Sequence, residues 1–316
     1  MPSGLLDRRL LFVTGKGGVG KTTIAAALGL LAASHGQRTL LCEVDAKGNL
    51  AGAFETGPTE FKQREIAPDL WAMSMDTEAS LKEYLGLQLK LPLLARLGPL
   101  ARTFDFVANA APGVKEILVV GKLCYEVRED NYDLVVVDAP ASGHIVGQLA
   151  APAAIGDLVQ VGRVRDQTSW MLDILGDPAR TGVVIVSTPE EMPVTETLEL
   201  TERLRTETVV DVASVVVNRV LPELFTHSDE EVFRALREPA RAAALAEAVG
   251  GPTEPVLDGA ELAVRLRRTR AEHLGELRNG LPKGVELLYV PELFQRTHGV
   301  RATRQIADSL GAELGF

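Results

Sequence analysis

The chain has 316 residues, 46% of them hydrophobic and 24% charged, and carries a formal net charge of −10 at pH 7. This length and composition are enough for one large α/β domain with an insertion, or for two domains. The negative charge argues against nucleic acid as a partner, and two cysteines, Cys42 and Cys124, argue against a disulfide framework.

The N-terminal segment before residue 14 lacks the pattern of a secretory signal peptide. The longest apolar run, residues 24–33, is too short to cross a membrane. We therefore expect a cytoplasmic protein with no stable membrane insertion.

The stretch "VTGKGGVGKTT", residues 13–23, matches the template of a phosphate-binding loop. An apolar run at 9–14 precedes it as a predicted strand, and an Ala/Leu-rich run at 22–35 follows as a predicted helix. In this setting Lys21 would contact the β- and γ-phosphates of a nucleotide, and the Thr22 hydroxyl would hold Mg²⁺. The predicted nucleotide-binding residues of the loop are Gly15, Lys16, Gly17, Gly18, Val19, Gly20, Lys21, Thr22 and Thr23.

Apolar runs that predict strands recur along the whole chain. Most are continuously apolar rather than alternating, which is typical of strands that are buried on both faces of a parallel sheet. Helical patterns lie between them, so we predict an α/β fold: a three-layer P-loop domain over residues 1–316, with a mostly parallel, doubly wound sheet. The predicted strands are 9–14, 38–44, 70–75, 132–138, 182–187, 212–218 and 285–290.

Residues 79–129 interrupt this alternation and predict a helical insertion of short helices broken by Pro and Gly. A second helical stretch, 145–175, is a candidate to pack with it. The leucines of the insertion either join it to itself and to the sheet or line a groove for an apolar partner. Further along, Ser228 and Asp258 are predicted helix caps, and the basic run 265–270 is predicted to be a solvated helix face.

Two aspartates follow predicted strands, at the sheet edge where ligands of α/β folds bind. Asp138 ends the apolar run "DLVVVD" and is a candidate to touch Mg²⁺ through water. Asp45 follows the second strand and is a candidate to orient or activate the attacking water. Each is also compatible with a helix cap or a turn.

Beyond these features, "GKGGVGKTT" resembles the deviant phosphate loop of the dimeric ATPases that include MinD, ParA and the nitrogenase iron protein. Within that class, "VDAKGNLAGAF" and "DAPASGH" are similar to the first and second switches of the branch formed by the arsenite-pump ATPase and the ATPase of guided entry of tail-anchored proteins. "LWAMSMDTEASLKEYL", "STPEEMPVTETLEL" and "VVVNRVLP" resemble further segments of that branch, and the likeness runs from about residue 9 to about residue 297.

The resemblance implies roles for single residues. Lys16 matches the lysine that reaches across a dimer interface to the nucleotide of the facing subunit, and Asp45 matches the catalytic aspartate. Asn218 matches the asparagine that reads adenine, and Pro291 begins a loop similar to the one that covers the base. The implied protein hydrolyses ATP with Mg²⁺ as a homodimer, or as a heterodimer with a paralogous ATPase, and its dimer opens and closes to bind or deliver an apolar segment such as a tail anchor.

Departures from the branch leave alternatives open. The first switch lacks the usual proline and histidine between Asp45 and Asn49, so a slow or regulatory nucleotide-binding subunit remains an alternative. The chain has no Cys-x-x-Cys pair, and we expect neither zinc nor an iron–sulfur cluster. A positioning ATPase like MinD or ParA is a further alternative, although the C-terminal segment "RATRQIADSLGAELGF" has only two arginines and no lysine.

Overall fold

The computed structural model describes residues 4–45, 49–77, 79–80, 83, 113–158, 161–294 and 299–316. An eight-stranded sheet forms their centre, in the order β3-β4-β2-β5-β1-β6-β7-β8, and its strands run parallel except for the antiparallel β3–β4 pair. The strands are β1 Leu10–Gly15, β2 Thr39–Glu43, β3 Arg64–Ala67, β4 Leu70–Ser74, β5 Leu134–Asp138, β6 Thr181–Ser187, β7 Val212–Val220 and β8 Glu286–Pro291.

Each strand predicted from an apolar run is present, with bounds shifted by at most a few residues. The edge strand β3 was not predicted. Its four residues are exposed or half-buried, and two of them are charged. A partly exposed strand at the lateral edge of a sheet needs no apolar run, since backbone hydrogen bonds to β4 hold it in place. Hydrophobic patterning therefore does not detect it.

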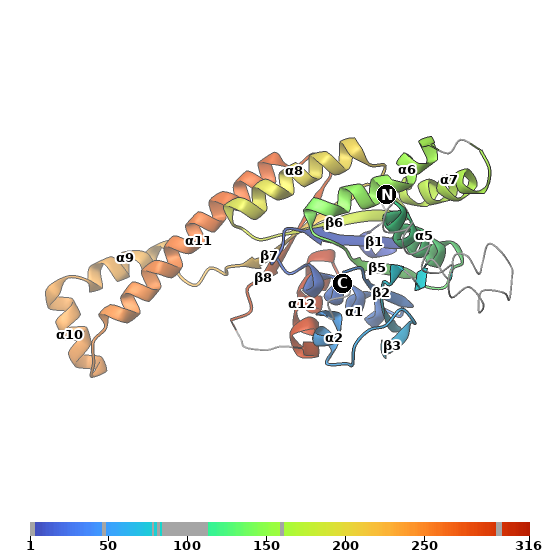
Figure 1. Cartoon of the computed structure of the whole chain (residues 1–316). Helices are drawn as coiled ribbons and strands as arrows, with labels where there is room; N and C mark the ends of the chain where they lie inside the picture. The colour runs from blue at the N-terminus through green and yellow to red at the C-terminus, as the bar shows by residue number, and fades with distance from the viewer. Residues whose placement is uncertain are drawn as a thin grey trace.

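Helices cover both faces of the sheet, which confirms the three-layer α/β prediction (Figure 1). Alternate residues of β1 point to opposite faces, so Leu10 and Phe12 pack in one core cluster and Leu11 and Val13 in the other. The first face carries α5 Val114–Arg128, α6 Ser142–Leu158, α7 Arg163–Leu175 and α8 Glu191–Glu207, and the second carries α1 Lys21–Ser34, α2 Asn49–Phe54 and α12 Gly299–Leu314.

Most of the predicted insertion at 79–129 lies outside the described residues, and its described end is the single helix α5. Val120 and Leu123 of α5 share a core cluster with Leu149 of α6 and Leu175 of α7. The stretch 145–175 therefore contacts α5, while its membership of one helical unit with the rest of the insertion stays a prediction. Among the helices described, none combines the length and apolar character needed to cross a membrane.

A helical arm, residues 221–281, projects from the first face of the sheet (Figure 1). Its long helix α11, Glu254–Gly280, packs against α8 near its C-terminal end and carries α9, His227–Leu236, and α10, Pro239–Val249, at its far end. No residue of α9 or α10 is buried, so the arm has little core of its own.

The arm corrects two predicted helix caps. Thr226, not Ser228, caps α9, and it exchanges hydrogen bonds with Asp229 in a capping box. Asp258 lies inside α11 and forms an ion pair with Arg237 at 2.8 Å. A hydroxyl residue does cap α9, but it is Thr226, two positions before Ser228. Asp258 does not cap a helix; its carboxylate instead joins α11 to Arg237, the residue that follows α9.

The basic run 265–270 lies on α11, and three of its arginines form ion pairs with acids of neighbouring segments. Arg267 reaches Glu223 at 3.7 Å, Arg270 reaches Glu190 at 3.6 Å, and Arg268 pairs with Glu230. These side chains are at least partly exposed, as expected for a solvated helix face carrying ion pairs.

Alanine substitutions at two helical glycines should change the free energy of unfolding in opposite directions. A Cβ at Gly29 of α1 would lie 2.7 Å from Cδ2 of Leu41, so Gly29→Ala should lower the free energy of unfolding by about 1–3 kcal/mol through overpacking. A Cβ at the exposed Gly147 of α6 would meet nothing within 4 Å, so Gly147→Ala should raise it by up to about 1 kcal/mol through helix propensity. Urea unfolding of both variants checks the pair, and equal shifts would contradict the packing of α1 on β2.

Candidate active site

The phosphate loop leaves the sheet at Gly15, the last residue of β1, and enters α1 at Lys21. Gly15 has a φ of 144°, and a Cβ there would lie 2.1 Å from the carbonyl oxygen of Val186 in β6. Gly20 has a φ of 97°, and a Cβ there would lie 2.4 Å from the side-chain nitrogen of Asn218. Both ends of the loop therefore exclude any side chain, for steric reasons as well as conformational ones.

The middle of the loop is open on its outer side. A Cβ at Gly17 or Gly18 would meet nothing within 4 Å, whereas Val19 is 2% exposed and holds the loop against the core. The Lys21 ammonium donates to the carbonyl oxygen of Lys16 at 3.2 Å, across the loop. Backbone N–H groups and an ammonium around an open glycine-rich turn form a setting for a phosphate group.

Thr22 and Asp138 meet directly beneath this loop. The Thr22 hydroxyl donates to Oδ2 of Asp138 at 2.6 Å, and Asp138 is 7% exposed at the end of β5. Burial, with smaller contributions from the nearby Glu43 and Asp45, raises the pKa of Asp138 to about 6, against the lowering effects of the Thr22 hydrogen bond and Lys21. A hydroxyl and a carboxylate are hard oxygen ligands, so the pair fits Mg²⁺. Thr23 follows half-buried in the same turn of α1.

Sequence reasoning missed Glu43, a buried carboxylate beside Asp138. Glu43 is 1% exposed at the end of β2, where it is in register with Asp138 of β5. One of its carboxylate oxygens accepts the backbone N–H of Asn49 at 2.9 Å, and the other accepts the Ser74 hydroxyl at 3.3 Å. Glu43 thus ties the start of α2 to the sheet edge. Its position could have been noticed in the sequence, because Glu43 is an acid that ends the otherwise apolar run of the second strand.

Asp45 is exposed just beyond the end of β2, and its charge acts on Asp138. The next residues of the first switch, 46–48, lie outside the described residues. Asp45 is therefore near the predicted metal ligands, and its catalytic role stays a prediction.

Asn218 and Pro291 end neighbouring strands on the same side of the sheet. Asn218 of β7 is 6% exposed; its Nδ2 donates to the carbonyl oxygen of Val19 at 2.9 Å, and its Oδ1 accepts the backbone N–H of Arg219 at 2.9 Å. The amide therefore anchors the phosphate loop. Pro291 is exposed at the end of β8, and most of the following loop lies outside the described residues. Contact of either residue with adenine stays a prediction.

Lys16 has a partner that the sequence did not indicate. Its ammonium forms an ion pair with Glu196 of α8, and the other carboxylate oxygen of Glu196 accepts the Ser142 hydroxyl at 3.3 Å. Ser142 begins α6 within the second-switch segment that starts at Asp138, and Gly143 and His144 follow in the first turn of that helix. Three separate stretches of the chain thus meet at Glu196.

The strands bring most of the predicted residues together at one edge. Gly15, Asp138 and Asn218 lie at or near the carboxyl ends of β1, β5 and β7, with Glu43 at the end of β2. This is the edge where ligands of parallel α/β sheets bind.

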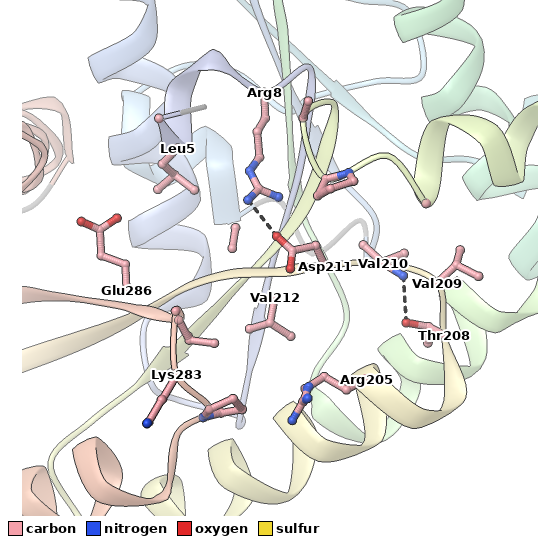
Figure 2. A pocket seen from close by; sticks show the side chains of 18 residues that line it. Leu5, Arg8, Arg205, Thr208, Val209, Val210, Asp211, Val212, Lys283 and Glu286 are labelled. Atoms are coloured by element: carbon pink, nitrogen blue, oxygen red, sulfur yellow. Dashed lines mark hydrogen bonds and ion pairs between the residues drawn. The ribbon is translucent and has the colours of Figure 1, made fainter. Parts of the chain in front are cut away.

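A separate cavity of about 1040 Å³ lies at the opposite edge, near the amino ends of β1 and β7 (Figure 2). The Arg8 guanidinium crosses it to Asp211 at 2.8 Å and also donates to the carbonyl oxygen of Thr181 at 2.7 Å. Arg8 is 9% exposed, and its contacts join the starts of three strands, so it acts as a structural clamp away from the phosphate loop.

The raised pKa of Asp138 predicts a pH-dependent stability of the nucleotide-free and metal-free protein. The pKa of Asp138 in the folded protein is about 6, above the ordinary 3.8 expected in the unfolded chain, so the folded state binds this proton more tightly. The protonated carboxyl therefore stabilises the fold at low pH, and that stabilisation is lost as pH rises through about 6. Asp138→Asn avoids this loss, so its free energy of unfolding relative to wild type should increase by about 2 kcal/mol between about pH 4.5 and pH 7.5. Denaturant unfolding at both pH values checks this. The exposed Asp173→Asn on α7 is the control, and a pH-independent difference for Asp138→Asn would contradict the assigned burial effect.

Comparison with known proteins identifies the family. The family model for anion-transporting ATPases (ArsA_ATPase) matches residues 8–172 and 158–243. ATPase BagA of Mycobacterium tuberculosis H37Rv is 36% identical over 232 residues, which cover 70% of this chain and 68% of that protein. A putative arsenical pump-driving ATPase of Aquifex aeolicus is 25% identical over 261 residues, which cover 73% of this chain and 85% of that protein.

An ATPase ASNA1 homologue of Entamoeba dispar is 27% identical over 250 residues, which cover 67% of this chain and 76% of that protein. The family-model match includes the phosphate loop and extends over most of the sheet. The family model and these relatives confirm the resemblance inferred from the motifs: the chain belongs to the ArsA family of anion-transporting ATPases.

Proposed function

We propose that this protein is a Mg²⁺-dependent nucleotide-clamp ATPase that acts in the cytoplasm, whose dimer opens and closes with the state of its nucleotide to bind or deliver an apolar protein segment. The observation that carries the proposal is the Thr22–Asp138 contact of 2.6 Å beneath an open phosphate loop, in a chain of an ATPase family. Loop, hydroxyl and buried carboxylate together supply what phosphoryl transfer to water needs first: a cradle for phosphates and ligands for a metal.

The residues of the site divide this work. The loop N–H groups and Lys21 bind the phosphates, and Thr22 with Asp138, the latter through water, holds Mg²⁺, which neutralises charge on the phosphate oxygens when bound. Asp45 orients the attacking water from the end of β2. Asn218 keeps the phosphate loop in its binding conformation through its hydrogen bond to Val19. The adenine binds beside Asn218, under the loop that begins at Pro291.

The clamp itself rests on Lys16. Lys21 already serves the phosphates within the subunit, so a second loop cation is best used across a dimer interface, where it stabilises charge that grows on the transferred phosphoryl group. Hydrolysis then depends on a closed dimer of two copies or of this chain with a paralogue. The leucine-rich insertion at 79–129 supports an apolar protein segment, such as a tail anchor, as the client.

ATP turnover tests the catalytic assignment. Wild type should hydrolyse ATP, and both Lys16→Ala and Asp45→Asn should lower kcat by at least about a hundredfold, because each removes a group that acts in the transition state. Steady-state turnover with and without a magnesium chelator, beside mass measurement in ADP and in ATP, checks this. Full activity of Lys16→Ala would contradict the clamp. Nucleotide binding without turnover by wild type would instead favour the slow regulatory subunit that needs a paralogue.

Nucleotide preference tests Asn218. If Asn218 both anchors the loop and reads adenine, Asn218→Ala should raise the Kd of ATP about tenfold and that of GTP much less, because loss of one base-specific hydrogen bond costs about 1–1.5 kcal/mol. Calorimetric titration with both nucleotides measures the two constants. An equal rise for ATP and GTP would assign Asn218 to loop anchoring alone.

A further inference from the structure

Glu196 of α8 is the acceptor that holds Lys16 in this structure. The Lys16 ammonium pairs with one carboxylate oxygen of Glu196, and the Ser142 hydroxyl donates to the other at 3.3 Å. The two charged side chains are 27% and 32% exposed, so they are neither sealed in the core nor free in water. The pair therefore carries a modest free energy, which a competing contact can replace.

This contact is incompatible with the proposed role of Lys16. An ammonium that donates to a carboxylate of its own subunit is partly neutralised and is turned towards α8, whereas an ammonium that reaches a facing nucleotide must point out of its subunit. Lysine has a long flexible side chain that can adopt either position, but one ammonium cannot occupy both. Glu196 and the nucleotide of the facing subunit thus compete for Lys16.

We propose that Glu196 is a positioning residue that retains Lys16 within its own subunit until the closed dimer takes it over. The inference rests on the proposed function, because it gives the resting state of the lysine that acts in the clamp. Each closing event must break two such ion pairs when both subunits are copies of this chain, so Glu196 sets a threshold against closure without bound ATP.

Two contacts around Glu196 offer routes by which Lys16 could be released. Ser142 belongs to the second-switch segment, whose Pro140 carbonyl oxygen accepts the Thr14 hydroxyl at 2.7 Å beside the phosphate loop. A shift of this segment changes the Ser142–Glu196 contact directly. On its other side, α8 packs against α11, the long helix of the arm, so a partner that moves the arm also acts on the helix that carries Glu196.

Glu196→Gln tests the retention of Lys16. Glutamine keeps the shape and can still accept from Ser142, but it removes the charge that pairs with Lys16. With each ion pair worth roughly a threefold factor, the dissociation constant of the ATP-bound dimer should fall about tenfold. Sedimentation over a range of protein concentrations in saturating ATP measures it. Glu199→Gln, which removes an exposed carboxylate one turn along the same helix, is the matched control and should leave the constant unchanged.

A second measurement reads the contact without dimer formation. In the nucleotide-free monomer, the rate at which an amine-acylating reagent labels Lys16 should rise about threefold in Glu196→Gln, because its ammonium is no longer held by a carboxylate. Mass spectrometry of the labelled peptides gives this rate, with the other lysines of the same sample as internal references. The rate should not change in Glu199→Gln.

The outcomes separate this inference from the proposed function. A tighter dimer together with faster labelling in Glu196→Gln supports retention, whereas no change in labelling overturns it. A loss of turnover as large as that of Lys16→Ala, with an unchanged dimer constant, also overturns it, since Glu196 would then support Lys16 during catalysis. If no variant dimerises in ATP, or Lys16→Ala hydrolyses ATP as wild type does, the clamp fails, and the labelling rate alone decides whether Glu196 retains Lys16.

Discussion

The close approach of Gly15 to β6 is the constraint on which the site depends. The chain must leave β1 where its backbone lies against the carbonyl of Val186, in a conformation and a space that admit no side chain. Because β1 lies between β5 and β6, a loop that exits here is bordered by the ends of both strands. Asp138 of β5 reaches the first turn of α1 as a consequence, and the Thr22–Asp138 contact follows from the order of the strands.

The same geometry gathers negative charge at the edge that is proposed to bind an anionic nucleotide. Glu43 and Asp138 are buried neighbours in register, and both Glu43 and Asp45 raise the pKa of Asp138. Such a cluster is unfavourable unless cations share it. A bound metal with the lysines of the phosphate loop would relieve it, which supports the proposal that a nucleotide binds here together with its cation.

Helix α8 contacts regions that lie far apart in the sequence. One side of it contacts α6 and carries Glu196, next to Ser142 and Lys16, and its other side packs on α11. The arm of α9, α10 and α11 has few buried residues, so its position relative to the sheet depends on this α8–α11 packing. A single packed helix therefore lies between the arm and the phosphate loop.

The sequence by itself determined the local structure: continuous apolar runs identified the parallel strands, and the spacing of glycines, Lys21 and Thr22 identified the phosphate loop. It also indicated Asp138 and Asp45 as candidate site residues, because acids that follow buried strands gather at one edge of a parallel sheet. The tertiary structure decided the pairing of Glu43 with the start of α2, the projection of the arm, and the ion pair between Lys16 and Glu196, which lie 180 positions apart. Periodicity and spacing show which face of an element is apolar. They do not show which distant element packs against that face, because this depends on strand order and helix packing across the whole fold.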